Sequence, residues 1–216
     1  MPRPDVSEER RPQIVEAATR VFIRKGYRKT SMPDVAHEAG LSIGGVYWYF
    51  KSKDEIVLAI LGQCFQSDLE ALKTLLNADA PATQRVKSFV TSYIESYTEY
   101  AWLNPIGIQF YAESVHDPKV RGFIQQYLSH YRQALVTLIE QGIRNGEFRP
   151  VDPVDTANAI LGLEEGLSLL LVADPEGVDW KKSFQTGVEL LLAGLIVRHE
   201  SAGVSVDSGS SLTRSA

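Results

Sequence analysis

The apolar residues of this chain recur at helical spacing along most of its length. Between residues 9 and 25, Ile14, Ala17, Ala18, Val21 and Phe22 follow the i, i+3, i+4, i+7, i+8 pattern of a helix that buries one stripe. No segment of useful length alternates between apolar and polar residues, as a half-buried strand would. Further long helices are predicted over residues 53–76, 81–103, 105–116, 117–145, 152–173 and 180–199. The pattern therefore predicts an all-α fold.

Two short helices are predicted between the first helix and the long one that follows. Ser31 and Asp34 make a capping-box signature for the first of them. Gly40 stands where a helix ends on a left-handed residue, and Ser42 is placed to cap a second helix over residues 43–50. Two short helices joined by a glycine-containing turn are typical of a helix-turn-helix, whose second helix enters the major groove of DNA.

The outward side of this second helix carries residues suited to DNA. Glycines at its N-terminal end let the backbone approach base edges and phosphates, and lysines stand at its exit. Three consecutive aromatic residues between them are more than so short a helix can bury, although core packing stays open for part of Tyr47. Base-facing positions are predicted at Gly45 and Trp48. Phosphate contacts are predicted for Thr30, Ser42, Tyr47, Tyr49 and Lys53, with Ser31, Ile43, Gly44 and Lys51 completing the DNA-binding set.

Four spaced motifs within residues 14–60 are similar to those of a known family. They are AA-x3-F from Ala17 to Phe22, KGY-x2-T from Lys25 to Thr30, VA-x2-AG-x-S from Val35 to Ser42, and VYWYFKSKD from Val46 to Asp54. Together they closely resemble the N-terminal DNA-binding domain of TetR-family transcriptional regulators. The chain departs from that family at Ile43, where a basic or polar residue is common, and at Gly45, where Thr, Ala or Asn is common.

The resemblance implies a function for the whole chain. TetR-family regulators are homodimers that bind double-stranded, palindromic operator DNA, most often as repressors, and are released by a small-molecule effector. The effector cavity lies in the C-terminal part of such proteins. We therefore expect a ligand-responsive transcriptional regulator with operator DNA, a small effector and a second copy of itself as partners.

The predicted helices fall into two parts and a tail. Residues 1–53 form a three-helix head with the helix-turn-helix, and residues 54–200 form a helical ligand-binding and dimerisation body. The long helix over residues 53–76 joins the two and is the natural lever between them. Residues 201–216 are rich in Ser and Gly with little apolar content, so a disordered tail is expected there.

Charge and cysteine content narrow the class of protein. The chain has a net charge of −5, but residues 1–53 hold ten Lys and Arg against six Asp and Glu. A basic head on an acidic body fits a local DNA site better than general coating of nucleic acid. The lone Cys64 excludes an internal disulfide and is expected to be a buried, inert thiol. Because no signal peptide or membrane-spanning run is visible, a cytoplasmic protein without a membrane partner is expected.

Two C-terminal segments, residues 160–172 and 188–197, are apolar nearly all round. Helices of that kind must be covered on several sides. Because a helix-turn-helix protein usually reads two half-sites as a symmetric dimer, we expect these helices to pair with those of a second copy. Burial inside one protomer is the alternative. The predicted interface residues are Leu161, Glu165, Ser168, Leu169, Val172, Leu191, Gly194 and Leu195.

Aromatic residues are frequent in the segment between residues 93 and 131. Pockets between bundle helices are commonly lined by aromatic side chains with a few polar groups, although each aromatic residue taken singly is more often core. Glu164 shares a helical face with apolar residues and needs a partner if it is buried. The predicted pocket residues are Tyr93, Tyr97, Trp102, Phe110, Glu113, Tyr127, Tyr131 and Glu164, with Tyr111, His116 and Asn158 as further candidates.

Two other classes of protein remain as alternatives. Glu113 and His116 form one Glu-x-x-His, but a di-iron bundle needs a second such motif and none is present. Neither a phosphate-binding glycine loop nor a nucleophile elbow occurs, so we expect no catalytic residue, metal or cofactor. A helical interaction protein that does not bind DNA specifically is the other alternative. Within the regulator, the helix over residues 105–116 is expected to shift against the long helix when ligand binds.

Overall fold

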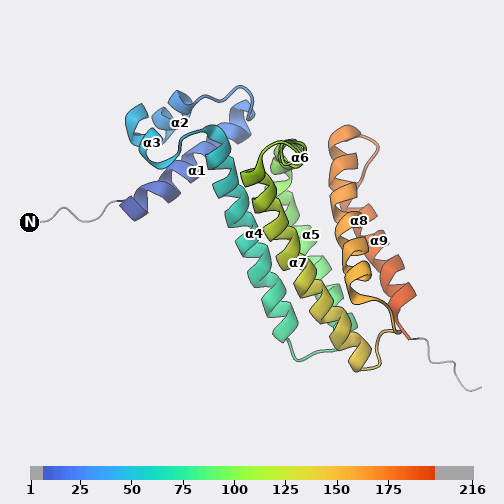
Figure 1. Cartoon of the computed structure of the whole chain (residues 1–216). Coiled ribbons are helices and arrows are strands. Elements are labelled where there is room, and N and C mark those ends of the chain that lie inside the picture. Colours follow the sequence, from blue (N-terminus) through green and yellow to red (C-terminus); the bar gives the residue numbers. More distant parts are fainter. Residues whose placement is uncertain (1–6, 198–216) are drawn as a thin grey trace, which may run out of the picture.

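The computed structural model describes residues 7–197, which fold into helices (Figure 1). The α-helices are α1 (Ser7–Lys25), α2 (Met32–Glu38), α3 (Ile43–Tyr49), α4 (Lys53–Asn77), α5 (Ala82–Tyr100), α6 (Asn104–Glu113), α7 (Pro118–Arg144), α8 (Pro153–Ala173) and α9 (Trp180–Leu195), with a 3-10 turn, η1 (Ala101–Leu103), before α6. No strand occurs among these residues apart from one isolated bridge between Phe148 and Ile196. The all-α prediction is confirmed, while the predicted tail at 201–216 lies outside the described residues.

Local capping signals place most helix ends where the sequence predicts them. Ser31 and Asp34 make the capping box of α2, and Ser42 caps α3 by accepting a hydrogen bond from the Gly45 amide. Gly40 takes a φ of +64°, the left-handed conformation that ends α2. The last helix is an exception. It was predicted to run to residue 199, but it ends at Leu195, where the chain turns extended to pair with the segment at Phe148.

The helices form a head at one end of α4 and a layered body along the rest of it (Figure 1). Helices α1 to α3 pack on one another and on the first turns of α4. In the body, α4, α5 and α7 pack together, and α8 and α9 form an outer layer against α5 and α7. Helix α6 lies at the head end of the body, where it packs on α7 and α8.

One hydrophobic core is shared between the head and the upper body. Phe50 and Val46 from α3 and its end are fully buried with α1 residues in this core. The same core continues into residues of α4, η1, α6 and α7 that we call the junction cluster: Ile56, Val57, Ile60, Leu61, Leu103, Ile106, Phe110 and Val120. Because apolar burial stabilises by about 25 cal/mol per Å², this continuity resists independent movement of the head and α6.

A second hydrophobic core fills the far end of the body. Its buried members come from α4, α5, α7, α8 and α9 and from the loop residue Phe148, and Trp180, Phe184 and Tyr131 are among the largest. Glu147 accepts hydrogen bonds from the Ala82 and Thr83 amides and so caps α5 at its first turn. These contacts hold the chain that connects α4 to α5 against the end of α7.

A substitution at Gly142 in α7 can test how tightly this second core is packed. A Cβ at position 142 would overlap the ring of Phe148, which is buried. We expect Gly142→Ala to lower the free energy of unfolding by about 1–3 kcal/mol, because overpacking moves side chains off their rotamers. Gly122→Ala is the matched control, since Gly122 is an exposed residue of the same helix with open space around it. That control should stabilise the protein by roughly 0.5–1 kcal/mol through helix propensity. Denaturant midpoints at one protein concentration measure both, and equal midpoints for the two variants would contradict the packing.

Candidate DNA interface and effector pocket

One face of α3 packs against the rest of the head, and the opposite face is exposed. Val46 and Phe50 are fully buried against the head core, at an i, i+4 spacing that marks the inner face. Trp48 has 77% of its surface exposed, and Ile43 and Tyr47 are also exposed. A large aromatic side chain with so much free surface is uncommon in a soluble domain and is typical of a contact surface. The described structure thus leaves the outward face of α3 open for a major groove.

Most predicted DNA-binding residues lie at the surface of the head. Ser31, Ser42, Gly44 and Lys51 are exposed, and Gly45 is half-buried. Tyr49 is half-buried and packs against the head core, so only part of it can reach a phosphate.

Thr30 is a correction to the predicted set. Only 2% of its surface is exposed, and its hydroxyl donates to the Gly26 carbonyl at 2.9 Å. Its side chain therefore holds the turn between α1 and α2 instead of contacting phosphate.

The two lysines after α3 are anchored to the head by their own contacts. Lys51 Nζ donates to the Tyr47 carbonyl at 2.8 Å, at the C-terminal end of α3. Lys53 Nζ donates to the Tyr27 carbonyl at 2.9 Å and lies 4.5 Å from the centre of the Tyr27 ring. An ammonium has three donors, so both lysines keep protons for a phosphate. Their positions are fixed before DNA arrives, which lowers the entropy lost on binding.

Part of the positive charge of the head is used within the head. Arg20 and Arg24 both pair with Glu38, at 2.9 and 3.0 Å, and Lys25 pairs with Asp34 at 2.6 Å. These pairs tie α1 to α2. The Lys25 ammonium and the Ser31 groups hold the pKa of the Asp34 carboxyl well below its usual range. The charge left for DNA is therefore smaller and more local than the composition alone indicates.

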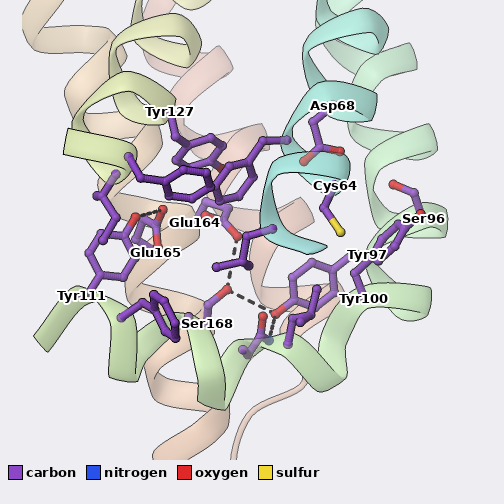
Figure 2. Close-up of a pocket in the computed structure, with 18 of the residues that line it drawn as sticks. Cys64, Asp68, Ser96, Tyr97, Tyr100, Tyr111, Tyr127, Glu164, Glu165 and Ser168 are labelled. Atoms are coloured by element: carbon purple, nitrogen blue, oxygen red, sulfur yellow. Dashed lines mark hydrogen bonds between the residues drawn. The ribbon is translucent and has the colours of Figure 1, made fainter. Parts of the chain in front are cut away.

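A cavity of about 140 Å³ lies between α4, α5, α6, α7 and α8 in the upper body (Figure 2). Its wall is largely aromatic, with three carboxylates and, among the described residues, no Lys, Arg or His. The lining residues are Leu61, Cys64, Phe65, Asp68, Tyr93, Ser96, Tyr97, Tyr100, Leu103, Asn104, Gly107, Phe110, Tyr111, Phe123, Ile124, Tyr127, Glu164, Glu165 and Ser168. A concave, aromatic site with a few polar groups has the character of a small-molecule pocket.

Several residues predicted for a pocket line this cavity. They are Tyr93, Tyr97, Phe110, Tyr127 and Glu164, together with the further candidate Tyr111. Tyr131 is not in the wall but packs edge-on behind Tyr127, with ring centres 5.0 Å apart. Because it supports a lining ring, Tyr131 belongs to the surroundings of the cavity.

Trp102 and Glu113 are corrections to the predicted pocket. Trp102 lies in η1, and its ring packs against the head core. Glu113 is the last residue of α6 and is exposed. The further candidates His116 and Asn158 also lie outside the cavity wall, and Asn158 instead accepts a hydrogen bond from Arg132.

Sequence reasoning missed the contribution of α4 to the cavity. Cys64, Phe65 and Asp68 line it, and Asp68 continues the i, i+4 series of Ile60 and Cys64 along one face of α4. An acidic residue on an otherwise apolar stripe was the signal that could have found it. Burial also raises the pKa of the Cys64 thiol to about 12, which fits the expected inert thiol.

Glu164 and Glu165 accept hydrogen bonds in the cavity, and the described wall places no basic residue beside them or Asp68. Glu164 Oε1 accepts from the hydroxyls of Tyr93 and Ser168, each at 3.2 Å. Glu165 Oε1 accepts from the Tyr111 hydroxyl at 2.6 Å. Burial, with the neighbouring Glu165 charge, raises the pKa of Glu164 to about 8, and burial raises the pKa of Asp68 to about 6. Ionising these carboxylates therefore costs free energy that the hydroxyl hydrogen bonds offset only in part, and no basic residue of the described wall offsets the rest.

The predicted dimer residues divide between the surface and the interior. Leu169 and Val172 on α8 and Gly194 on α9 are exposed, and Leu191 is half-buried. Glu165 is half-buried and lines both the cavity and a surface groove that includes Leu169.

Leu161, Ser168 and Leu195 are corrections, since all three are buried within the protomer. Ser168 lines the cavity, where its hydroxyl lies 3.2 Å from the Tyr97 hydroxyl. The apolar surface that pattern reasoning missed is Leu170 and Leu190, of which 52% and 70% are exposed. One residue along a helix turns the side chain by about 100°, which separates exposed Leu190 from half-buried Leu191.

Helix α8 is long and apolar enough to cross a membrane by length and composition, and 11% of that window is buried in the protomer. This is weak grounds for a membrane span, since the core helix of a soluble protein passes the same test. Within residues 7–197, no group of three His, Cys, Asp or Glu is placed to hold a metal ion. Asp68, Glu164 and Glu165 of the cavity therefore form no such group.

Comparison with known proteins gives two family matches along the chain. Residues 14–60 match the family described as bacterial regulatory proteins, tetR family, and residues 82–196 match the BetI-type transcriptional repressor C-terminal family. An uncharacterised HTH-type transcriptional regulator of Bacillus subtilis, YfiR, is 30% identical over 166 residues, which cover 74% of this chain and 78% of that protein.

Two solved structures are similar to this fold. A putative transcriptional regulator from Saccharomonospora viridis in complex with choline superposes with a TM-score of 0.71 at 23% identity, covering 89% of this chain and all of that one. The complex of SmeT with triclosan superposes with a TM-score of 0.71 at 19% identity, covering 95% of this chain and all of that one. The resemblance found in the helix-turn-helix motifs is confirmed, and with it a ligand-responsive regulator in place of an enzyme. The chain belongs to the TetR family of bacterial transcriptional regulators.

Proposed function

We propose that this protein is a cytoplasmic repressor that binds a palindromic operator as a homodimer and leaves it when a small molecule enters the cavity. The observation that carries the proposal is the open face of α3, where Trp48 and Tyr47 stand exposed while Val46 and Phe50 hold the helix from behind. DNase I footprinting on the DNA beside the gene tests it. A protected, two-fold symmetric site is expected, and the absence of any protected site would contradict it.

Operator recognition is divided between two kinds of contact. The base-facing part is Trp48, with Gly45 letting the backbone come close. The phosphate part is the set of hydroxyls and lysines around it, which fix the register of the head on the duplex. Ile43, an exposed apolar side chain at the start of α3, suits contact with a thymine methyl group.

Dimerisation follows from the apolar surface of α8 and α9. Leu169, Leu170, Val172 and Leu190 are all exposed in the protomer, and they lie on the two helices that form the outer layer of the body (Figure 1). Several large apolar side chains exposed on two neighbouring helices are typical of an interaction surface. A two-fold axis through this patch would cover it with the same patch of a second copy.

Effector binding reaches the head through shared residues. Leu61, Leu103 and Phe110 belong both to the cavity wall and to the junction cluster. A ligand that moves Phe110 therefore also changes the packing of α6 on the first turns of α4. Since α3 is buried against the same core, the two heads of a dimer would change their spacing, and operator affinity would fall. Thermodynamic linkage requires operator to weaken effector binding by the same factor.

Replacing Lys53 and Trp48 separates the two kinds of DNA contact. Lys53→Ala should weaken binding about equally on all sequences and lower the slope of log K against log salt by roughly one per subunit. Trp48→Ala should change the ratio of operator to mutated-operator affinity by roughly ten-fold, because it removes a base-facing group. Fluorescence anisotropy over a range of salt concentrations measures both quantities.

Lys73→Ala is the matched control for the loss of positive charge, since Lys73 is an exposed lysine of α4 beyond the head. It should change neither the slope nor the ratio. Thermal unfolding of Lys53→Ala checks that losing the contact with Tyr27 leaves the head folded. A sequence-specific effect of Lys53→Ala together with a uniform effect of Trp48→Ala would reverse the assignment of the faces.

Leu190→Glu tests the dimer. A carboxylate placed in an apolar interface loses its hydration and gains no ion-pair partner. The dimer dissociation constant should therefore rise at least roughly ten-fold. Sedimentation velocity should then shift from the mass of two chains toward 24.0 kDa. Val115→Glu is the matched control, because Val115 is a comparably exposed apolar residue that follows α6 and belongs to neither α8 nor α9. Unchanged dimerisation of Leu190→Glu would place the interface elsewhere.

A further inference from the structure

The described wall of the cavity carries negative charges that no positive charge balances. Asp68 comes from α4, and Glu164 and Glu165 come from α8, so acidic groups enter from two different walls (Figure 2). The described wall contains no basic residue. The hydroxyls of Tyr93, Ser168 and Tyr111 donate hydrogen bonds to the glutamates but carry no charge. A half-buried carboxylate that stays ionised is stabilised by a cation, and the described wall supplies none.

The ionisable groups around Glu164 are acidic or neutral on every side. The ionisable groups that act on it are Asp68 from α4, Tyr93 and Tyr97 from α5, Tyr111 from α6, Tyr127 and Tyr131 from α7, and Glu165 from its own helix. Arg132 shares a neighbouring groove with Glu165, but its guanidinium donates to Asn158 and does not shift the pKa of Glu165. An anionic effector would bring a further negative charge into this set and would be repelled.

The rest of the wall favours an organic cation over an inorganic one. Five tyrosines and three phenylalanines line the cavity, and the faces of aromatic rings attract ammonium groups. The rings also supply apolar surface for a hydrocarbon body. The carboxylates, in contrast, are not grouped as metal ligands. A metal ion would gain nothing from the aromatic wall, whereas a substituted ammonium uses both kinds of group.

We propose that the effector of this protein is an organic cation, an ammonium or quaternary ammonium group on a compact apolar body, held by Glu164, Glu165 and Asp68 within the tyrosine-rich wall. The proposal rests on the proposed function only in taking this cavity as the effector site. The two related structures do not decide the class, because choline is a cation and triclosan is a neutral phenol. The carboxylates that line the cavity of this chain are what favour a cation.

Calorimetry with three probes of similar shape tests the charge preference. The probes are phenyltrimethylammonium, its neutral carbon isostere tert-butylbenzene, and benzoate, each titrated into the full-length protein at pH 8. The cation should bind at least roughly ten-fold more tightly than the isostere, through its charge and the aromatic faces, and benzoate should not bind. Equal or tighter binding of either other probe, or no binding of the cation, overturns the proposal.

Variants assign the preference to the carboxylates. Glu164→Gln and Asp68→Asn keep the shape of the side chains and should each weaken the cation roughly ten-fold while leaving tert-butylbenzene unchanged. Glu95→Gln, an exposed carboxylate on α5, is the matched control and should have no effect. Circular dichroism confirms that each variant is folded. Cation binding that is insensitive to both cavity variants would place the cation elsewhere and overturn the proposal.

Binding of the cation should depend on pH through the protein alone, since phenyltrimethylammonium has no proton to lose. The cation binds ionised Glu164, whose pKa in the empty site is raised to about 8 by burial and by Glu165. Affinity should therefore rise roughly ten-fold or more from pH 6 to pH 8, with release of a proton, and level off above pH 8. Glu164→Gln should remove most of this rise and leave the smaller part due to Asp68, whose pKa burial raises to about 6. An affinity that falls as pH rises would overturn the proposal.

A DNA-release assay separates this inference from the proposed function. A cation that binds in the cavity without changing operator affinity upholds the ligand class and contradicts the regulatory role. An operator complex that is dissociated only by neutral or anionic compounds upholds the regulatory role and overturns the cation.

Discussion

The uninterrupted helix α4 is the constraint on which the rest of the structure depends. Its first turns bury Ile56, Val57 and Ile60 in the same core that holds Phe50 behind α3, and its later turns line the cavity. An α-helix with its backbone hydrogen bonds intact bends little, so a displacement at one end is carried to the other. DNA contact and ligand contact are in this way properties of one rigid element and not of two independent domains.

That arrangement explains why the cavity can hold unfavourable charge. Ionised carboxylates in the wall lower the stability of the empty protein, and the raised pKa values of Glu164 and Asp68 express the same free energy. Apolar burial in the junction cluster and in the core around Trp180 compensates for it. A site that is strained when empty gains more when its ligand arrives, so part of the binding free energy comes from removing that strain.

Local signals made the head predictable, and their absence made the body less so. Ser31, Asp34, Gly40 and Ser42 specify helix ends by hydrogen bonds within a few residues, and all four act as expected. Thr30 could not be assigned in the same way, because whether its hydroxyl faces solvent or Gly26 depends on how the turn folds back.

The outer helices α8 and α9 show what the hydrophobic pattern of the sequence could not predict. They are apolar nearly all round, so the hydrophobic periodicity does not tell which face packs in the protomer and which is exposed. The rotation of each helix about its axis, which tertiary packing determines, buries Ser168 and exposes Leu190. The place of Asp68 in the cavity, by contrast, could have been predicted, since it extends an apolar stripe of α4. Phe110 unites these observations. The aromatic pattern predicts its place in the cavity wall, and its membership of the core behind α3 is the link through which we propose that an occupied cavity affects DNA binding.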